Sequence, residues 1–135
     1  MIDTQVDYSV ALALAARTYP PYSKFAVGAA FKCRSETVVV GADIENRSFG
    51  LTICTERVAI GAAVAAGERD FVAIAVTADS DEPIVPCGGC RQFLAESNWN
   101  LIIVSETIRG HRKIENLLHL LPEPTRGILK HAEPS

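Results

Sequence analysis

The sequence predicts an α/β fold, a three-layer α/β/α sandwich around a mixed sheet of about five strands. Short, continuous apolar runs at residues 71–76 and 101–105 are typical of strands that are covered on both faces. Segments with helical patterns alternate with the strands along most of the chain, which favours a partly parallel sheet. No repeat or linker divides the 135 residues, so we expect one domain over residues 1–135.

The first elements are a helix and a hairpin. A helix is predicted over residues 4–18, and the two prolines that follow end it. Strands at residues 25–33 and 37–40 flank a short polar turn, which is the pattern of an antiparallel hairpin. The sheet is therefore expected to begin with an antiparallel pair.

Three further helices are expected after the hairpin. Residues 56–66 are apolar almost all round and stop at Gly67, which predicts a buried helix. Residues 87–97 form the second predicted helix, between the two apolar strands. A last amphipathic helix is predicted over residues 114–121, directly before Pro122.

The composition is that of an acidic protein with a substantial core. Apolar residues make up 48% of the chain and charged residues 21%, which excludes a mostly disordered chain. The net charge of −3 disfavours a nucleic-acid partner, since only Arg109, Arg112 and Lys113 cluster, in an expected surface turn. With no signal-peptide pattern and no apolar run long enough to span a membrane, we expect a cytoplasmic protein without a membrane partner.

The cysteines need an explanation other than disulfides, which are rare in the cytosol. Cys87 and Cys90 lie three positions apart at the predicted start of a helix and so share one face. Two thiolates in this arrangement can bind one tetrahedral Zn²⁺. A redox dithiol and a pair of buried structural thiols are the alternatives.

Cys54 supplies a third thiol at the start of the buried helix. Three protein ligands leave one coordination position open, as catalytic zinc requires. Glu56 should not bind the same ion, because positions i and i+2 of a helix point apart. In the first turn, however, its carboxylate could reach a water held by the metal, which makes it the candidate proton carrier.

Three thiolates around Zn²⁺ leave a net negative charge that other groups must offset. The N-termini of the two predicted helices would contribute partial positive charge. Arg57 and Arg91 directly follow ligand segments and could donate hydrogen bonds to the thiolates. The alternative for each is a solvated surface charge, and Arg57 is the stronger candidate because it interrupts an apolar helix.

Cys33, at the end of an apolar strand, is interpreted as a small buried residue. A structural four-cysteine zinc site is the alternative, but Cys33 and Cys54 are too far apart in sequence to form the close ligand pair that such sites use. The histidines follow no metal-binding spacing, and all lie in the last quarter of the chain: His111, His119 and His131.

Two of these motifs together resemble the zinc-dependent cytidine deaminases. That family has a ligand two residues before a catalytic glutamate and a later Pro-Cys-x-x-Cys, which correspond to Cys54-Thr55-Glu56 and Pro86-Cys87-Gly88-Gly89-Cys90. The all-cysteine set is similar to the small homotetrameric branch. The segments PYSKFAVG at residues 21–28 and Ile44-Glu45-Asn46 are also similar to segments of the family.

The resemblance implies hydrolytic deamination of cytidine or deoxycytidine with release of ammonia. Zinc would activate water, while Glu56 would take its proton and protonate the adjacent ring nitrogen. Phe25 would pack against the base, Glu45 would bind a sugar hydroxyl, and backbone groups near Thr55 and Cys87 would recognise the exocyclic amine. Without the resemblance, Phe25 would be interpreted as core and Glu45 as a solvated turn residue.

The chain departs from the family at the expected sugar end. Asp43 stands where the family usually has a sugar-binding asparagine, so an acceptor-only carboxylate replaces an amide. Arg47 replaces a small residue, Phe49 a tyrosine and Thr55 an alanine, while Thr125 lies where a neighbouring subunit normally contributes an aromatic ring. The catalytic residues match the family, and the sugar-binding residues differ.

Three alternatives remain at this point. Blasticidin S deaminases share the zinc and glutamate arrangement, so a modified cytosine nucleoside is the second candidate substrate. A zinc-stabilised structural or binding module is the non-enzyme alternative. A polynucleotide-editing deaminase would need a basic, aromatic-rich groove, for which this acidic chain gives little support. The family's shared active sites also imply a homotetramer.

Overall fold

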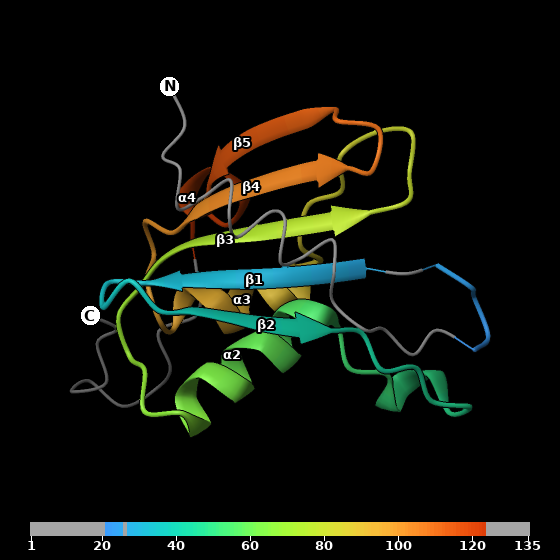
Figure 1. Ribbon diagram of the computed structural model, residues 1–135, viewed down its shortest axis with the longest axis horizontal. Coiled ribbons are helices and arrows are strands. Elements are labelled where there is room, and N and C mark those ends of the chain that lie inside the picture. Colours follow the sequence, from blue (N-terminus) through green and yellow to red (C-terminus); the bar gives the residue numbers. More distant parts are fainter. Residues whose placement is uncertain (1–20, 26, 124–135) are drawn as a thin grey trace.

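A mixed five-stranded sheet forms the centre of the molecule, in the order β2-β1-β3-β4-β5 (Figure 1). The computed structural model describes residues 21–25 and 27–123. Strands β3 and β4 are parallel, and the other neighbouring pairs are antiparallel. The strands are β1 Val27–Cys33, β2 Val38–Ala42, β3 Phe71–Ala78, β4 Ile102–Thr107 and β5 Arg112–Asn116. The expected mixed sheet is therefore confirmed.

The N-terminal hairpin is present as expected. Strands β1 and β2 pair antiparallel, with Phe31 opposite Val39, and a hydrogen bond from Cys33 N to Thr37 O (2.9 Å) closes the turn. Glu36 has a positive φ of 73° in this turn. The hairpin forms one side of the sheet, and β1 continues it by pairing with β3.

Two α-helices of the described chain cover one face of the sheet, α2 (Thr55–Ala65) and α3 (Gly88–Ala95) (Figure 1). Helix α2 ends where Gly67, at φ 93°, donates to Val64 O. A 3₁₀ turn, η1 (Phe49–Leu51), precedes α2, and the short helix α4 (Leu117–Leu120) follows β5. The two expected helices thus lie within one or two residues of their predicted bounds.

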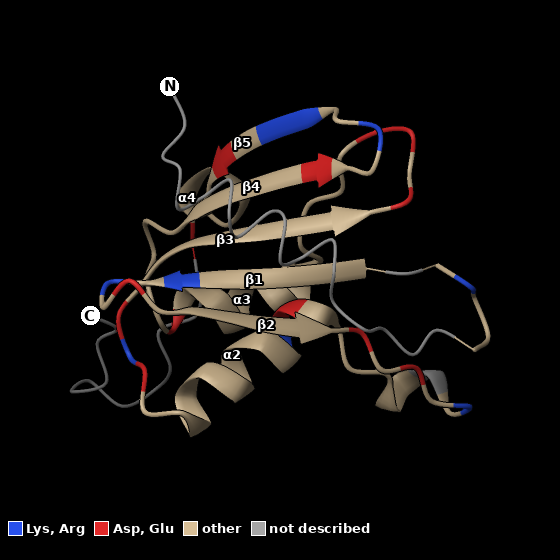
Figure 2. Ribbon diagram, in the orientation of Figure 1, with Lys and Arg blue, Asp and Glu red and all other residues tan. Residues whose placement is uncertain are grey.

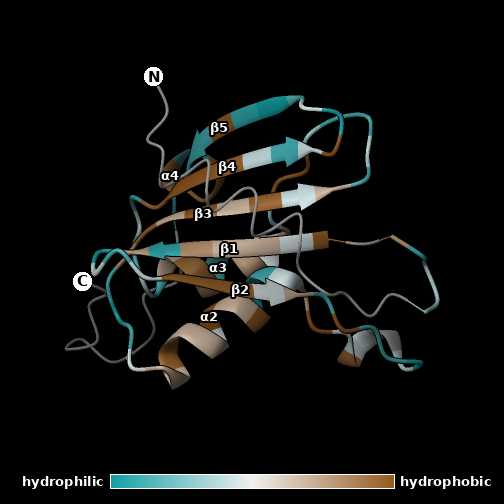
Figure 3. Cartoon of the chain, in the orientation of Figure 1, coloured by the Kyte–Doolittle hydropathy of each residue, from teal (hydrophilic) through white to brown (hydrophobic). Residues whose placement is uncertain are grey.

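The main core lies between the sheet and these helices. The Phe31 and Phe71 rings meet at 5.2 Å between centroids. Strand β2 approaches α2 so closely that a Cβ on Gly41 would stand 2.4 Å from Ala59 N, which explains a glycine in this strand. The central strands and α2 are largely apolar, whereas charged residues lie mainly in loops and on the edge strand β5 (Figures 2 and 3). Close packing of β2 on α2 fixes the helix that begins directly after Cys54.

The opposite face of the sheet is also buried at its centre. There, Ala30, Ala75 and Val104 form a smaller buried cluster, with Val38 beside it. The helix predicted at residues 4–18 lies outside the described residues. Among the described residues, no helix has both the length and the apolar character needed to cross a membrane.

The prediction of a helix over residues 114–121 was wrong for its first half. Residues 112–116 form strand β5, in which Ile114 pairs with Val104 of β4, and only residues 117–120 are helical. A tight turn at Gly110, whose φ is +89°, returns the chain along β4. Arg112 and Lys113 therefore lie in an edge strand and not in a surface turn, because cross-strand pairing outweighs the helical spacing of the leucines.

Candidate active site

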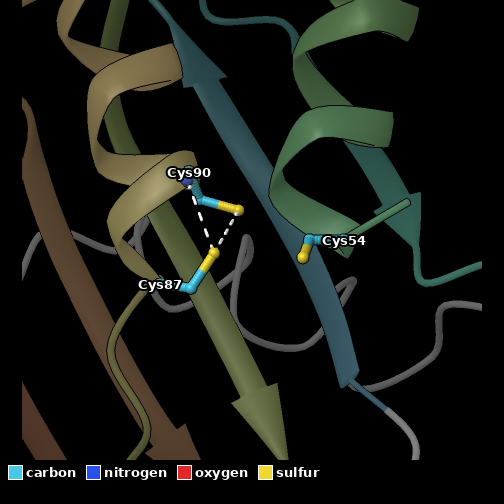
Figure 4. Close-up of side chains that lie close together, drawn as sticks. All are labelled: Cys54, Cys87 and Cys90. Carbon is cyan, nitrogen blue, oxygen red and sulfur yellow. Dashed lines mark hydrogen bonds between the residues drawn. The ribbon is translucent and has the colours of Figure 1, made fainter. Parts of the chain in front are cut away.

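Three cysteine side chains converge where α2 and α3 begin (Figure 4). Cys54 directly precedes α2, Cys87 directly precedes α3, and Cys90 lies in the first turn of α3. Their Sγ atoms all lie within 4.8 Å of one another, and those of Cys87 and Cys90 are 3.2 Å apart. Both helices pack on the same face of the sheet, which brings the two N-termini together.

The cluster fits a zinc ion in its donor chemistry and spacing. With Zn–S bonds of about 2.3 Å, the sulfurs of a tetrahedral site stand roughly 4 Å apart, close to the separations found here. Three thiolates leave the fourth position free for a reacting molecule. Within the described part of the chain, Cys54, Cys87 and Cys90 form the one group of three side chains that could hold a metal ion.

The surroundings shift the pKa values of Cys87 and Cys90 in opposite directions. Burial opposes ionisation of Cys87, but hydrogen bonds from the backbone N–H of Cys90 and from the neighbouring thiols bring its pKa below the usual value. Burial raises the pKa of Cys90, and the nearby Glu56 charge acts in the same direction. A bound cation would favour the thiolate form of both.

The two arginines beside the ligands make different contacts. Arg57 Nη2 donates to Cys54 Sγ at 3.8 Å, and this hydrogen bond raises the arginine's pKa. Arg91 instead donates from Nε to Pro86 O (2.8 Å) and from Nη1 to Leu120 O (3.0 Å). Arg57 thus touches a sulfur, whereas Arg91 ties the turn before Cys87 to α4.

Glu56 occupies the first turn of α2 and is only 6% exposed. Burial raises the pKa of its carboxyl group, partly offset by hydrogen bonding and by the Arg57 charge. Its side chain lines the same cavity as Cys54 and Cys87. A buried carboxyl beside metal ligands is suited to holding and releasing a proton.

This cavity has a volume of about 220 Å³ and brings together residues that are distant in sequence. Among them are all four residues expected to bind substrate: Phe25, Asp43, Glu45 and Thr55. The side chain of Phe25 is 38% exposed, so it lines the cavity and is not part of the core. The other lining residues are Ser23, Val27, Thr52, Ile84 and Val85, together with Cys54, Glu56 and Cys87.

Glu45 holds the segment that carries Phe25. Its Oε1 accepts hydrogen bonds from the backbone N–H groups of Tyr22 and Ser23, both at 3.0 Å, and its Oε2 accepts one from the Ser23 hydroxyl. The Ser23 hydroxyl bond is the main cause of the lowered pKa of Glu45. Ser23 Oγ in turn accepts from Phe25 N at 3.0 Å. This structural role of Glu45 was not predicted from the sequence.

Asp43 and Thr55 are the most buried of the expected substrate residues. Asp43 is 8% exposed and accepts a long hydrogen bond of 3.4 Å from Val27 N, and burial raises its pKa. Thr55 is fully buried, and its hydroxyl has no hydrogen-bond partner in the described residues. Ile84 and Val85 add an apolar wall that the sequence analysis missed, although they directly precede the Pro-Cys-x-x-Cys motif.

The family model described as "Cytidine and deoxycytidylate deaminase zinc-binding region" matches residues 2–106 of the chain. The chain belongs to this deaminase family. Among its relatives, a cytidine deaminase of Halalkalibacterium halodurans is 48% identical over 95 residues, which are 70% of this chain and 72% of the relative. A cytidine deaminase of Sporosarcina psychrophila is 41% identical, over 78% of this chain and 79% of that protein.

Solved structures of the family have the same fold. The crystal structure of a cytidine deaminase from Burkholderia pseudomallei matches with a TM-score of 0.85 and 40% identity, covering 88% of this chain and 98% of that one. A blasticidin-S deaminase from Bacillus cereus is 33% identical over 82 residues, or 55% of this chain and 59% of that protein. The resemblance inferred from the two cysteine motifs is confirmed.

Proposed function

We propose that this protein is a zinc-dependent hydrolase that deaminates cytidine and deoxycytidine to uridine and deoxyuridine, releasing ammonia. The observation that carries the proposal is the buried Glu56 carboxyl in one cavity with the ligands Cys54 and Cys87. The two relatives described above are both named cytidine deaminases, which supports this substrate.

Proton transfer is the task of Glu56 in this proposal. Zinc, held by the three cysteines, supplies the Lewis-acid chemistry that makes water nucleophilic near neutral pH. The Glu56 carboxylate accepts a proton from this water and delivers it to the ring nitrogen next to the amine-bearing carbon. As the water oxygen bonds to that carbon, the same carboxyl takes the second proton of the water and gives it to the amine, so that the C–N bond breaks and ammonia leaves. Its raised pKa suits a group that both takes and gives protons.

The walls of the cavity bind and orient the base. Phe25 packs against the pyrimidine ring, and Ile84 and Val85 provide further apolar surface that excludes water. Backbone groups near Thr55 and Cys87, at the starts of the two helices, hydrogen-bond the polar edge of the base. Asp43 and Glu45 face the sugar.

Arg57 supports the metal ligands through Cys54, and we assign Arg91 a supporting role through the turn before Cys87. We further infer that residues 1–135 form one domain that acts in the cytoplasm, in pyrimidine salvage, as a homotetramer. A free nucleoside, and not a nucleic acid, is the partner that the net charge of −3 favours.

The test is a substrate panel with zinc-loaded protein, followed by ultraviolet absorbance and ammonia release. Cytidine and deoxycytidine should be consumed faster than cytosine, cytidine monophosphate and blasticidin S. Glu56→Gln is the matched control, because it keeps the size of the side chain but cannot carry the proton. It should retain zinc and fold and lose at least about a thousandfold in turnover; undiminished turnover would refute the assigned mechanism.

A modified cytosine nucleoside is the second candidate substrate. It is favoured by the match to a blasticidin-S deaminase and by the carboxylate of Asp43 in the cavity. Faster turnover of blasticidin S than of cytidine would replace the first candidate with the second. A protein that binds zinc but releases no ammonia from any compound would be a structural or binding module.

A further inference from the structure

Asp43 is a buried carboxylate without a close hydrogen-bond partner among residues 21–25 and 27–123. It is 8% exposed, and the one hydrogen bond that its side chain accepts from the described residues, from Val27 N, is long at 3.4 Å. Buried charges in proteins are normally paired, because an unpaired one loses its hydration without compensation. Since Asp43 lines the cavity, a bound molecule can supply the missing partner.

The neighbouring Glu45 is not in this position. Both of its carboxylate oxygens already accept hydrogen bonds from Tyr22 and Ser23. Glu45 therefore accepts three hydrogen bonds in holding the segment that carries Phe25, whereas Asp43 accepts one long bond from the described residues and has more free acceptor capacity.

The charge of the cavity points to the chemistry of the missing partner. Three carboxyl groups line it, those of Asp43, Glu45 and Glu56, and its described lining includes no lysine or arginine. Burial raises the pKa of Asp43, and repulsion from Glu45 adds to this effect. A cation next to Asp43 would offset both the lost hydration of the carboxylate and the repulsion from Glu45. A neutral hydroxyl would offset only part of the lost hydration, and an anion would offset neither.

We propose that Asp43 is a specificity-determining residue that makes this site prefer cytosine nucleosides with a cationic amino group on the sugar over their hydroxyl counterparts. This inference rests on the proposed function, since it names the sugar chemistry accepted by the same site. The ammonium group donates a charge-assisted hydrogen bond to the Asp43 carboxylate, which is about twice as strong as a bond between neutral groups.

Binding of product analogues tests the inference separately from catalysis. Calorimetry near neutral pH compares uridine with the deoxyuridines that carry an amino group at the 2′, 3′ or 5′ position. At least one amino compound should bind the zinc-loaded protein about five- to tenfold more tightly than uridine, because its ammonium group adds a charge–charge attraction that a hydroxyl on the same carboxylate lacks. N-acetylation of that amine, which removes its charge, should abolish the advantage.

Asp43→Asn is the decisive variant, because the amide oxygen can still accept from Val27 N while the charge is lost. The Asp43→Asn variant should bind the amino compound and uridine about equally tightly. Asp70→Asn, which changes an exposed residue outside the cavity, should keep the preference for the amino compound. The inference is overturned if no amino compound binds more tightly than uridine, or if Asp43→Asn keeps the preference. Failure to deaminate cytidine would instead overturn the proposed function.

Discussion

At the scale of single residues, the four cysteines divide into three that converge and one that stands apart. Cys54, Cys87 and Cys90 form the cluster that could hold a metal ion, whereas Cys33, at the end of β1, is completely buried in the core. Burial raises the pKa of Cys33 to about 11, and the charge of Glu68 adds to this effect. A protonated thiol in an apolar environment is chemically inert.

Removing a proposed metal ligand should therefore abolish zinc binding, whereas removing Cys33 should leave it unchanged. Cys90→Ala should lose the ion and all measurable turnover, since two thiolates do not complete the site. Cys33→Ala should keep one zinc per chain and full turnover. Metal analysis of the purified variants measures the stoichiometry, and zinc loss in Cys33→Ala would place that residue in the site.

Cys33 should also contribute to the loss of stability at high pH. The thiol loses its proton near pH 9.0 in the unfolded chain but only near pH 11 in the folded protein. Between these values the unfolded state binds fewer protons, so the contribution is fully present below pH 9 and is lost as the pH rises to 11.

Urea unfolding of the wild type and Cys33→Ala at several values between pH 8 and pH 11 measures this contribution. The free energy of unfolding should fall less steeply with pH in Cys33→Ala than in the wild type. Equal slopes would show that Cys33 has no part in the alkaline transition.

At the scale of elements, the contact between β2 and α2 positions the end of the helix that lies in the candidate site. A methyl group on Gly41 would overlap the backbone of Ala59, so Gly41→Ala forces α2 away from the sheet. We expect a loss of about 1–3 kcal/mol in the free energy of unfolding, together with reduced turnover, because Cys54 and Glu56 move with the helix. Thermal unfolding and the cytidine assay measure the two effects.

Gly61→Ala in the same helix is the matched control. Gly61 faces open space, so the added methyl group meets no atom. Replacing a glycine inside a helix by alanine should stabilise the protein by about 0.5–1 kcal/mol. If the two variants behaved alike, helix propensity and not the close approach of β2 would determine the effect.

The elements also show which sequence patterns were informative. The apolar runs of β3 and β4 predict strands, and the glycine after α2 predicts the end of a helix. The predicted bounds of these three elements are nearly correct. Residues 114–121 carry leucines at helical spacing, yet Ile114 pairs with Val104 in the sheet. The pairing partner of an edge strand is set by tertiary contacts, which local spacing does not encode.

At the scale of the whole molecule, sequence motifs predict the cysteine cluster but only part of the cavity. Cys87 and Cys90 are close because they share a helix turn, and the metal spacing is visible in the sequence. The role of Glu45 in holding Ser23, and the single long hydrogen bond from Val27 to Asp43, depend on how distant segments fold together. Such contacts become visible only with the three-dimensional structure.

Three large apolar side chains are exposed next to residues that line the cavity. Ile44 and Ile53 pair in an isolated bridge, and both side chains are largely exposed, as is Leu51, at 67%. Their chain neighbours Glu45, Thr52 and Cys54 line the cavity. Large exposed apolar side chains that cluster in this way are typical of protein–protein interfaces.

We therefore expect Leu51→Asp to weaken the proposed homotetramer, because a charge would be buried against a neighbouring subunit. Turnover should also fall, because the adjacent cavity would lose the wall that the neighbouring subunit is expected to provide. Light scattering after gel filtration gives the mass, and the cytidine assay gives the activity at the same protein concentrations. Ile108→Asp changes an exposed apolar residue directly after β4, serves as control and should leave both unchanged. A Leu51→Asp monomer with full activity would show that each chain forms its active site alone.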